Sequence, residues 1–171
     1  ETANNKVAVP FDGDYKKMEE ILTHELTHAY VNEMNNNRSR ILSMNNLPFW
    51  LQEGLPEFEA VHGESVYNNM FVIDLLLNDR IGNLGMIGGY YAYRLGESFL
   101  VFIEEEYDRN KIMELFYAIR INRNIDITFK KVFGKDFEQI QLQWKNFLKR
   151  KYYPQFAEYD IPHEVFSRMT D

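Results

Sequence analysis

The segment EEILTHELTHAYVNEM, residues 19–34, constrains this chain more than any other, because its two histidines stand four positions apart. Residues four apart lie on one face of an α-helix, so His24 and His28 can present ring nitrogens to a single metal ion. Glu25 is turned by about 100° from His24 in a helix and can reach a water beside that ion. The pattern is the H-E-x-x-H motif of zinc enzymes, although two histidines on an ordinary amphipathic helix would give the same spacing.

A second segment, LPFWLQEGLPEFEA at 47–60, supplies acidic side chains that complete such a site. Glu53 follows His28 by 25 residues, which leaves room for the first helix to end, for a loop and for a second helix to return. Two histidines and a glutamate are one of the standard protein shells of catalytic zinc. Glu57 lies one helical turn after Glu53, where it can accept the second N–H of a ligating histidine and fix its tautomer. A solvated helix charge is the alternative for Glu57.

Length and composition limit the class of protein. The chain has 171 residues, and we expect a single domain over residues 1–171. Its net charge of −7 argues against a nucleic-acid partner, which usually requires a basic face. The absence of cysteine excludes disulfides and thiolate zinc sites. No apolar run is long enough for a transmembrane segment. Because the chain begins with Glu1 rather than methionine, we expect a fragment of a larger protein with further domains.

The pattern along the chain predicts a mainly α architecture. NKVAVP, residues 5–10, is typical of one short strand that ends at Pro10. We expect the first helix to begin near Asp14, which is a candidate N-cap. The expected helices cover about 14–35, 49–61, 66–77 and 90–107, and three more segments, 109–120, 127–134 and 136–152, follow. Residues 81–89 form a glycine-rich connection. The last segment carries a core stripe at helical spacing, namely Phe137, Ile140, Trp144, Phe147 and Leu148.

HELTHAY followed by LPFWLQEGLPEFE resembles the gluzincins, which are zinc peptidases of the thermolysin-like superfamily. It is especially similar to the bacterial peptidase MA-like domains, which carry H-E-x-x-H and then W-L-x-E-G-x-x-E. The resemblance implies an α+β zincin-like catalytic domain in which His24, His28 and Glu53 bind Zn²⁺ and Glu25 is the general base. It implies hydrolysis of a peptide or protein substrate. It also implies an extracellular or cell-envelope location, as one module of a larger protein.

The likeness continues in YRLGESFLVFIEEEY, residues 93–107, which resembles the Y-x-x-G segment of aminopeptidase-like gluzincins. The tyrosine of that segment stabilises the oxyanion, and the matching residue is Tyr93, with Gly96 three positions later. A core or surface tyrosine is the alternative. No G-x-M-E-N-type segment precedes the zinc helix, so an aminopeptidase that anchors a free amino terminus is not supported. Family members usually have several strands before that helix, and we expect that upstream sheet to be missing from this chain apart from the edge strand at 5–10.

Other interpretations of the same residues remain open at this point. A zinc ion could hold the helices together in a binding or scaffold module that has no catalytic activity. Glu25 and Tyr93 argue against a purely structural metal, because neither is needed to hold it. A helical domain without metal, with a motif that arose by chance, is a third interpretation. His62, nine residues after Glu53, is an alternative ligand, and His163 has no partner pattern.

Overall fold

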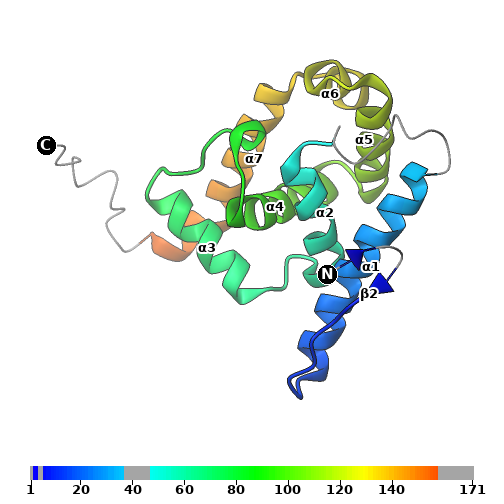
Figure 1. The fold of residues 1–171 in the computed structure, drawn as a ribbon. Coiled ribbons are helices and arrows are strands. Elements are labelled where there is room, and N and C mark those ends of the chain that lie inside the picture. Colours follow the sequence, from blue (N-terminus) through cyan, green and yellow to red (C-terminus); the bar gives the residue numbers. More distant parts are fainter. Residues whose placement is uncertain (1, 4–5, 37–46, 158–171) are drawn as a thin grey trace, which may run out of the picture.

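The computed structural model describes residues 2–3, 6–36 and 47–157, and this part of the chain is mainly helical (Figure 1). Two strands of two residues each, β1 (Thr2–Ala3) and β2 (Lys6–Val7), pair antiparallel at its start. The helices are α1 (Tyr15–Asn36), α2 (Phe49–Val61), α3 (Val66–Leu77), α4 (Tyr90–Glu106), α5 (Arg109–Asn122), α6 (Ile125–Phe133) and α7 (Phe137–Tyr152), with short 3-10 helices η2 (Leu84–Met86) and η3 (Tyr153–Phe156). The predicted mainly α class is therefore confirmed.

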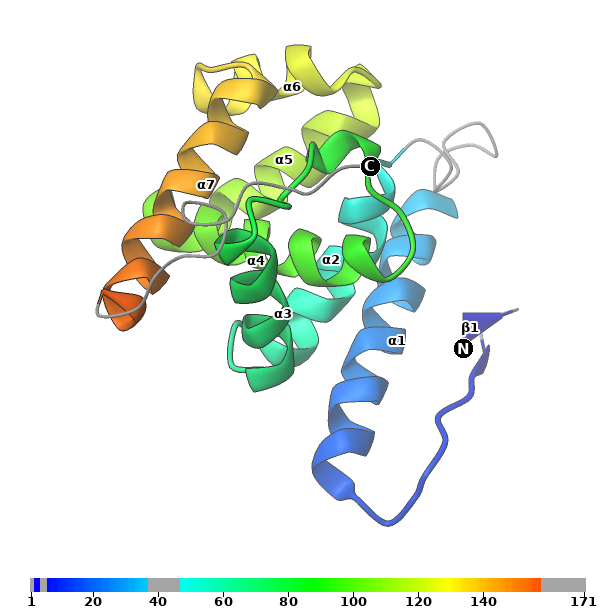
Figure 2. The ribbon, with the colours of Figure 1, turned by 90° about the vertical axis from the view of Figure 1, so that its left-hand side faces the viewer.

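The central element is α4, which packs against α2, α3, α5 and α7 (Figures 1 and 2). Every residue from Leu95 to Ile103 is buried, as expected for a helix with neighbours on all sides. Phe99 lies between two tryptophans, with ring centroids 5.2 Å from Trp50 of α2 and 5.5 Å from Trp144 of α7. These rings join α2, α4 and α7 in one hydrophobic core. The predicted core stripe of the last helix is confirmed, because all five of its residues are buried.

Glycines allow α2 and α4 to cross at very short distance. A Cβ added to Gly54 would lie 2.6 Å from the Cα of Gly96, and one added to Gly96 would lie 2.9 Å from the Cα of Gly54. Real Cβ atoms do not approach other carbons so closely, so any side chain here would push the helices apart. The crossing brings the residue before Gly54, Glu53, to the first turn of α4.

The helix α1 lies at one edge of the molecule, and its N-terminal half extends beyond the other helices (Figures 1 and 2). Asp14 caps it as predicted, because its carboxylate accepts a hydrogen bond of 3.1 Å from the backbone N–H of Lys17. Further along, α1 packs against α2. The histidine segment thus belongs to a helix whose main packing neighbour is α2, and α2 carries Glu53.

The structure corrects several predicted boundaries. The strand predicted over 5–10 is wrong in its extent, because only Lys6 and Val7 within it pair with β1 in the part of the chain that the structure describes. Proline at position 10 lacks the N–H that a further ladder bond needs. The connection at 81–89 contains the turn of 3-10 helix η2, which starts where the Asn83 side chain accepts the N–H of Gly85 at 2.8 Å. The helices predicted over 49–61 and 66–77 are confirmed.

Among the described residues, no helix combines the length and the apolar character that crossing a bilayer requires.

Candidate metal centre

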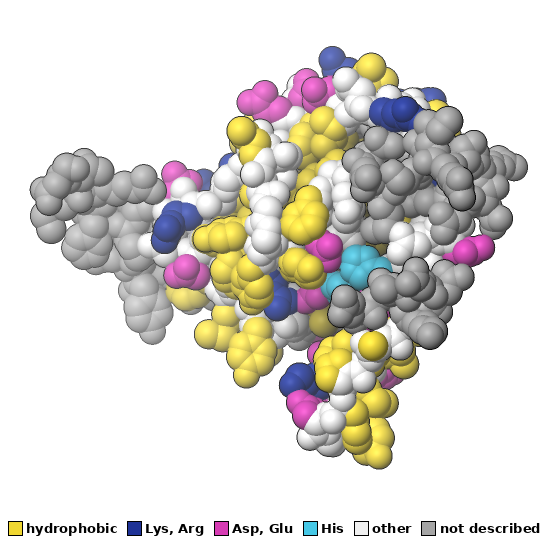
Figure 3. Space-filling view, viewed as in Figure 1, with side chains coloured by type: hydrophobic (Ala, Val, Ile, Leu, Met, Phe, Trp, Pro, Cys, Tyr) yellow, Lys and Arg dark blue, Asp and Glu magenta, His cyan; other side chains and the backbone are white. Residues whose placement is uncertain are grey.

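His24 and His28 of α1 face Glu53 of α2, and the three side chains are mostly buried, with 14%, 16% and 15% of their surfaces exposed. Their helical spacing places both rings on the side of α1 that contacts α2. Histidine side chains are visible at the surface beside acidic and hydrophobic side chains (Figure 3). Within the described residues, these three form the only group of histidine and acidic side chains with the geometry to hold a metal ion.

The three facing atoms form a compact triangle. The Nε2 atoms of His24 and His28 are 3.2 Å apart, and Oε2 of Glu53 lies 3.3 Å from the His28 nitrogen and 3.9 Å from the His24 nitrogen. A circle through these atoms has a radius of about 2.0 Å, which matches the zinc–nitrogen distance of about 2.0–2.1 Å in proteins. Two imidazoles and one carboxylate are also a donor set that zinc accepts. The residues therefore fit a zinc ion in both spacing and chemistry.

Glu57 lies behind His24, away from the triangle. Its Oε2 is 3.3 Å from Nδ1 of His24, so one ring nitrogen faces the triangle and the other faces a carboxylate. Burial alone would raise the pKa of Glu57, but the hydrogen bonds from His24 and Asn68 and the charge of Arg94 hold its pKa below the usual value. Glu57 is therefore ionised at neutral pH and accepts the Nδ1–H of His24, which leaves Nε2 free to bind a metal.

Glu53 and Tyr93 contact each other across the crossing of α2 and α4. Burial opposes ionisation of Glu53, but hydrogen bonds from His28 and Tyr93 hold its pKa below the usual value. Burial and the Glu53 carboxylate raise the pKa of Tyr93 to about 12, so its hydroxyl keeps its proton. The Tyr93 ring also stacks on His24, with centroids 5.8 Å apart and planes 13° apart. Tyr93 is thus a neutral hydrogen-bond donor at the edge of the metal centre.

Glu25 is half-buried and lies next to His24 in α1. Its negative charge contributes to the raised pKa of Tyr93. A mainly apolar cavity of about 370 Å³ lies on another side, between α1, α2 and α5. Thr23 and Thr27 line that cavity, and each directly precedes one of the histidines. On a helix they are therefore rotated by about 100° to one side of the histidines, whereas Glu25, which follows His24, is rotated by about 100° to the other side. The cavity therefore does not face Glu25.

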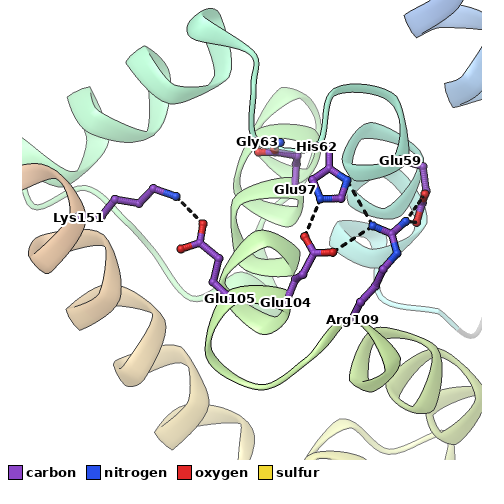
Figure 4. Close-up of polar contacts among 8 residues, drawn as sticks. All are labelled: Glu59, His62, Gly63, Glu97, Glu104, Glu105, Arg109 and Lys151. Carbon is purple, nitrogen blue, oxygen red and sulfur yellow. Dashed lines mark hydrogen bonds and ion pairs between the residues drawn. The ribbon is translucent and has the colours of Figure 1, made fainter.

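His62 does not reach the cluster. It ends α2 in a left-handed conformation, with φ 46°, and its Nε2 lies 2.7 Å from Oε2 of Glu104. Arg109 bridges Glu104 and Glu59 beside it, with N–O distances of 3.1 Å and 2.7 Å (Figure 4). These ion pairs connect α2, α4 and α5, and His62 is not among the described residues whose side chains have the geometry to share a metal ion. The alternative in which His62 replaces a ligand is not supported, and His163 lies outside the described residues.

Sequence reasoning missed two residues of the site, Arg94 and Asn68. Both contact Glu57: Arg94 donates from Nη1 to Oε1, and the Asn68 amide donates to the same oxygen at 3.1 Å. Arg94 directly follows Tyr93 in the segment that carried the family resemblance, which is the one signal that pointed toward it. Asn68 gives no such signal, because an asparagine in the first turn of a helix is ordinary.

Comparisons with models of protein families, with curated proteins and with solved structures found no match to this chain. The case for a metal centre rests on the arrangement of the side chains themselves.

Proposed function

We propose that this chain is a zinc-dependent peptidase in which His24, His28 and Glu53 hold the metal. The observation that carries the proposal is the triangle of donor atoms, with sides of 3.2, 3.3 and 3.9 Å, beside Glu25 of the same helix. The gluzincin likeness of the two motif segments supports a zincin-like catalytic domain and a peptide or protein substrate. An extracellular or cell-envelope location, as a module of a larger protein, is part of the same proposal.

In this proposal the chain's own residues move protons and stabilise charge. Bound zinc supplies Lewis-acid polarisation of a carbonyl and makes a water more acidic. Glu25 would take the proton of the attacking water as the water oxygen bonds to the carbonyl carbon. As the carbon–nitrogen bond breaks, Glu25 passes the proton to the leaving nitrogen. The Tyr93 hydroxyl, protonated because its pKa is about 12, would turn from Glu53 and donate to the oxyanion that develops on the carbonyl.

The test compares cleavage of casein by the wild type, by Glu25→Gln and by Glu20→Gln after zinc is added. Glu20 lies on the same helix with 40% of its side chain exposed, so its variant controls for the loss of one carboxylate from α1. We expect Glu25→Gln to keep its zinc and to lose about 10²- to 10⁴-fold in rate, the usual contribution of a general base. A chelator should abolish the wild-type activity. Equal rates for the wild type and Glu25→Gln would contradict the proposed mechanism.

A zinc-stabilised scaffold is the second candidate, and the position of α1 favours it. The helix α1 lies at the edge of the molecule (Figure 2), and its residues Leu26 and Tyr30 are exposed by 50% and 60%. Its position in the fold therefore depends mainly on its packing against α2. Zinc shared between α1 and α2 would strengthen that attachment. A scaffold predicts that zinc raises the melting temperature while no peptide is cleaved, and that Glu25→Gln changes neither property.

A further inference from the structure

Glu57 is held by two partners besides His24, and they come from two different helices. Arg94 of α4 donates to Oε1 of Glu57, as does the amide of Asn68 at the start of α3. Arg94 also donates to Oδ1 of the Asn68 side chain, so the two partners hold each other. The second carboxylate oxygen, Oε2, is left for His24. Both oxygens of Glu57 are therefore committed, each in a fixed direction.

The partners are themselves fixed in place. Asn68 is 1% exposed, and its backbone N–H donates to the N-cap hydroxyl of Ser65 at 3.3 Å. The guanidinium of Arg94 lies under the ring of Tyr90, 4.6 Å from its centroid. A glutamate side chain has three rotatable bonds, so without these contacts its carboxylate would sample several directions. With them, it can present Oε2 to His24 in one direction only.

From these contacts we propose that Arg94 is a positioning residue of the metal centre. Together with Asn68 it fixes the Glu57 carboxylate, which in turn keeps the Nδ1–H of His24 in place and its Nε2 directed at the metal. The inference rests on the proposed function for its metal, but the orientation of His24 can be measured without any metal. Partners beyond the ligands commonly change metal affinity by about 10- to 100-fold.

The positive charge of Arg94 and its contact with Glu57 have opposite effects on zinc affinity. A guanidinium close to a metal site repels the bound cation, so removing the charge alone would tighten zinc binding. Removing the contact with Glu57 would weaken it, because His24 loses its fixed orientation. The sign of the change in zinc affinity therefore separates the two effects.

The experiment measures zinc affinity by competition with a chromophoric chelator for the wild type, Arg94→Met, Arg94→Lys and Arg109→Met. Arg109 is the matched control, because it joins Glu59 of α2 to Glu104 of α4 and does not touch the metal cluster (Figure 4). Lysine keeps the charge, but it replaces the planar guanidinium, whose Nη1 donates to both Glu57 and Asn68, with a flexible and strongly hydrated ammonium. Circular dichroism in excess chelator checks that each variant is folded, and the milder Arg94→Lys variant decides the question if Arg94→Met is not.

We expect both Arg94 variants to bind zinc about tenfold more weakly, and Arg109→Met to stay within about twofold of the wild type. Unchanged or tighter binding in the Arg94 variants would overturn the inference, as would an equal loss in Arg109→Met.

A second measurement uses ¹⁵N-labelled histidine in the metal-free protein at about pH 8, where imidazole is neutral. We expect His24 to hold its proton on Nδ1 in the wild type and in Arg109→Met, and to lose this preference in Arg94→Met. The same tautomer in all three proteins would overturn the inference. If the wild type binds no zinc, the proposed function fails, and this measurement still decides the role of Arg94.

Discussion

The backbones of Gly54 and Gly96 meet where α2 crosses α4, and a Cβ on either residue would lie within 2.9 Å of the other's Cα. Each glycine lies close in sequence to a residue of the candidate metal centre: Gly54 directly follows Glu53, and Gly96 follows Tyr93 by three residues. The crossing brings the carboxylate of α2 and the hydroxyl of α4 into contact. The close contact between α2 and α4 thus places the segment QEG beside the segment YRLG.

Gly54→Ala should therefore reduce both stability and zinc affinity. The new methyl group would force α2 and α4 apart and displace Glu53 from the two histidines, at a cost of about 1–3 kcal/mol in the free energy of unfolding. The measurement is urea unfolding in chelator, followed by a zinc titration. Gly82→Ala is the control, because a Cβ there meets no atom within 4 Å. Equal stability of the two variants would show that the crossing tolerates a side chain.

Glu57→Ala should weaken zinc binding by about 10- to 100-fold while leaving the three ligands in place. The variant removes the acceptor that lies 3.3 Å from Nδ1 of His24. Competition with a chelator gives the affinity. Glu59→Ala is the control, since Glu59 is on the same helix and pairs with Arg109 instead. An affinity loss of the same size in Glu59→Ala would mean that the stability of α2, and not the contact with His24, is responsible.

Tyr93→Phe should lower kcat and leave zinc content unchanged. The phenyl ring can still stack on His24, but the hydroxyl that the proposed mechanism uses as a donor to the oxyanion is gone. Loss of one such donor costs about 2.7–4 kcal/mol in the barrier, or roughly 10²- to 10³-fold in kcat. Steady-state peptide hydrolysis measures it, with Tyr91→Phe as the control because Tyr91 is exposed by 42% and packs on Phe71. A kcat equal to that of the wild type would remove Tyr93 from the mechanism.

Glu97→Gln should stabilise the protein more at about pH 8 than at pH 4.5. Burial raises the pKa of Glu97 to about 7, and the negative charge of Glu57 adds to this, while the N–H of Gly63 opposes it (Figure 4). The folded state therefore binds the Glu97 proton more tightly than the unfolded state, whose pKa is near 4.5. The contribution of Glu97 to the free energy of unfolding is fully present below pH 4.5 and is lost as the pH rises through 7.

Glutamine cannot ionise, and its amide oxygen can still accept from Gly63. The stabilisation by Glu97→Gln, measured as the increase in the free energy of unfolding, should grow by about 3 kcal/mol between pH 4.5 and about pH 8, at about 1.4 kcal/mol per pKa unit. Urea unfolding at several pH values in chelator measures it. Glu105→Gln, which removes an exposed partner of Lys151, should show no such dependence. A gain for Glu97→Gln that is constant with pH would contradict the buried, protonated carboxyl.

The sequence was sufficient for those parts of the site that lie within single helices. The spacing of His24 and His28 follows from helical periodicity, as does the position of Glu57 one turn after Glu53. The second helix was located correctly although Pro56 lies inside it, because its hydrophobic residues keep helical spacing around the proline. Local pattern therefore supplied the ligand candidates and most helix boundaries.

What the sequence could not supply depends on contacts between helices. Arg94 of α4 and Asn68 of α3 both contact Glu57 of α2, and nothing in the sequence around either residue indicates these contacts. The predicted strand at 5–10 was too long for a related reason. Its alternation of side chains is a property of the segment, whereas a strand exists only as far as a partner pairs with it, and here the pairing covers Lys6 and Val7.

The central claim is that His24, His28 and Glu53 bind one zinc ion, and metal content tests it most directly. Wild type, Glu53→Ala and Glu59→Ala are stripped with chelator, reconstituted with zinc, desalted and measured by mass spectrometry alongside protein concentration. The account predicts about one zinc per chain for the wild type and for Glu59→Ala, and a strong loss for Glu53→Ala. A wild type without zinc, or a Glu53→Ala variant that retains it fully, would contradict the account.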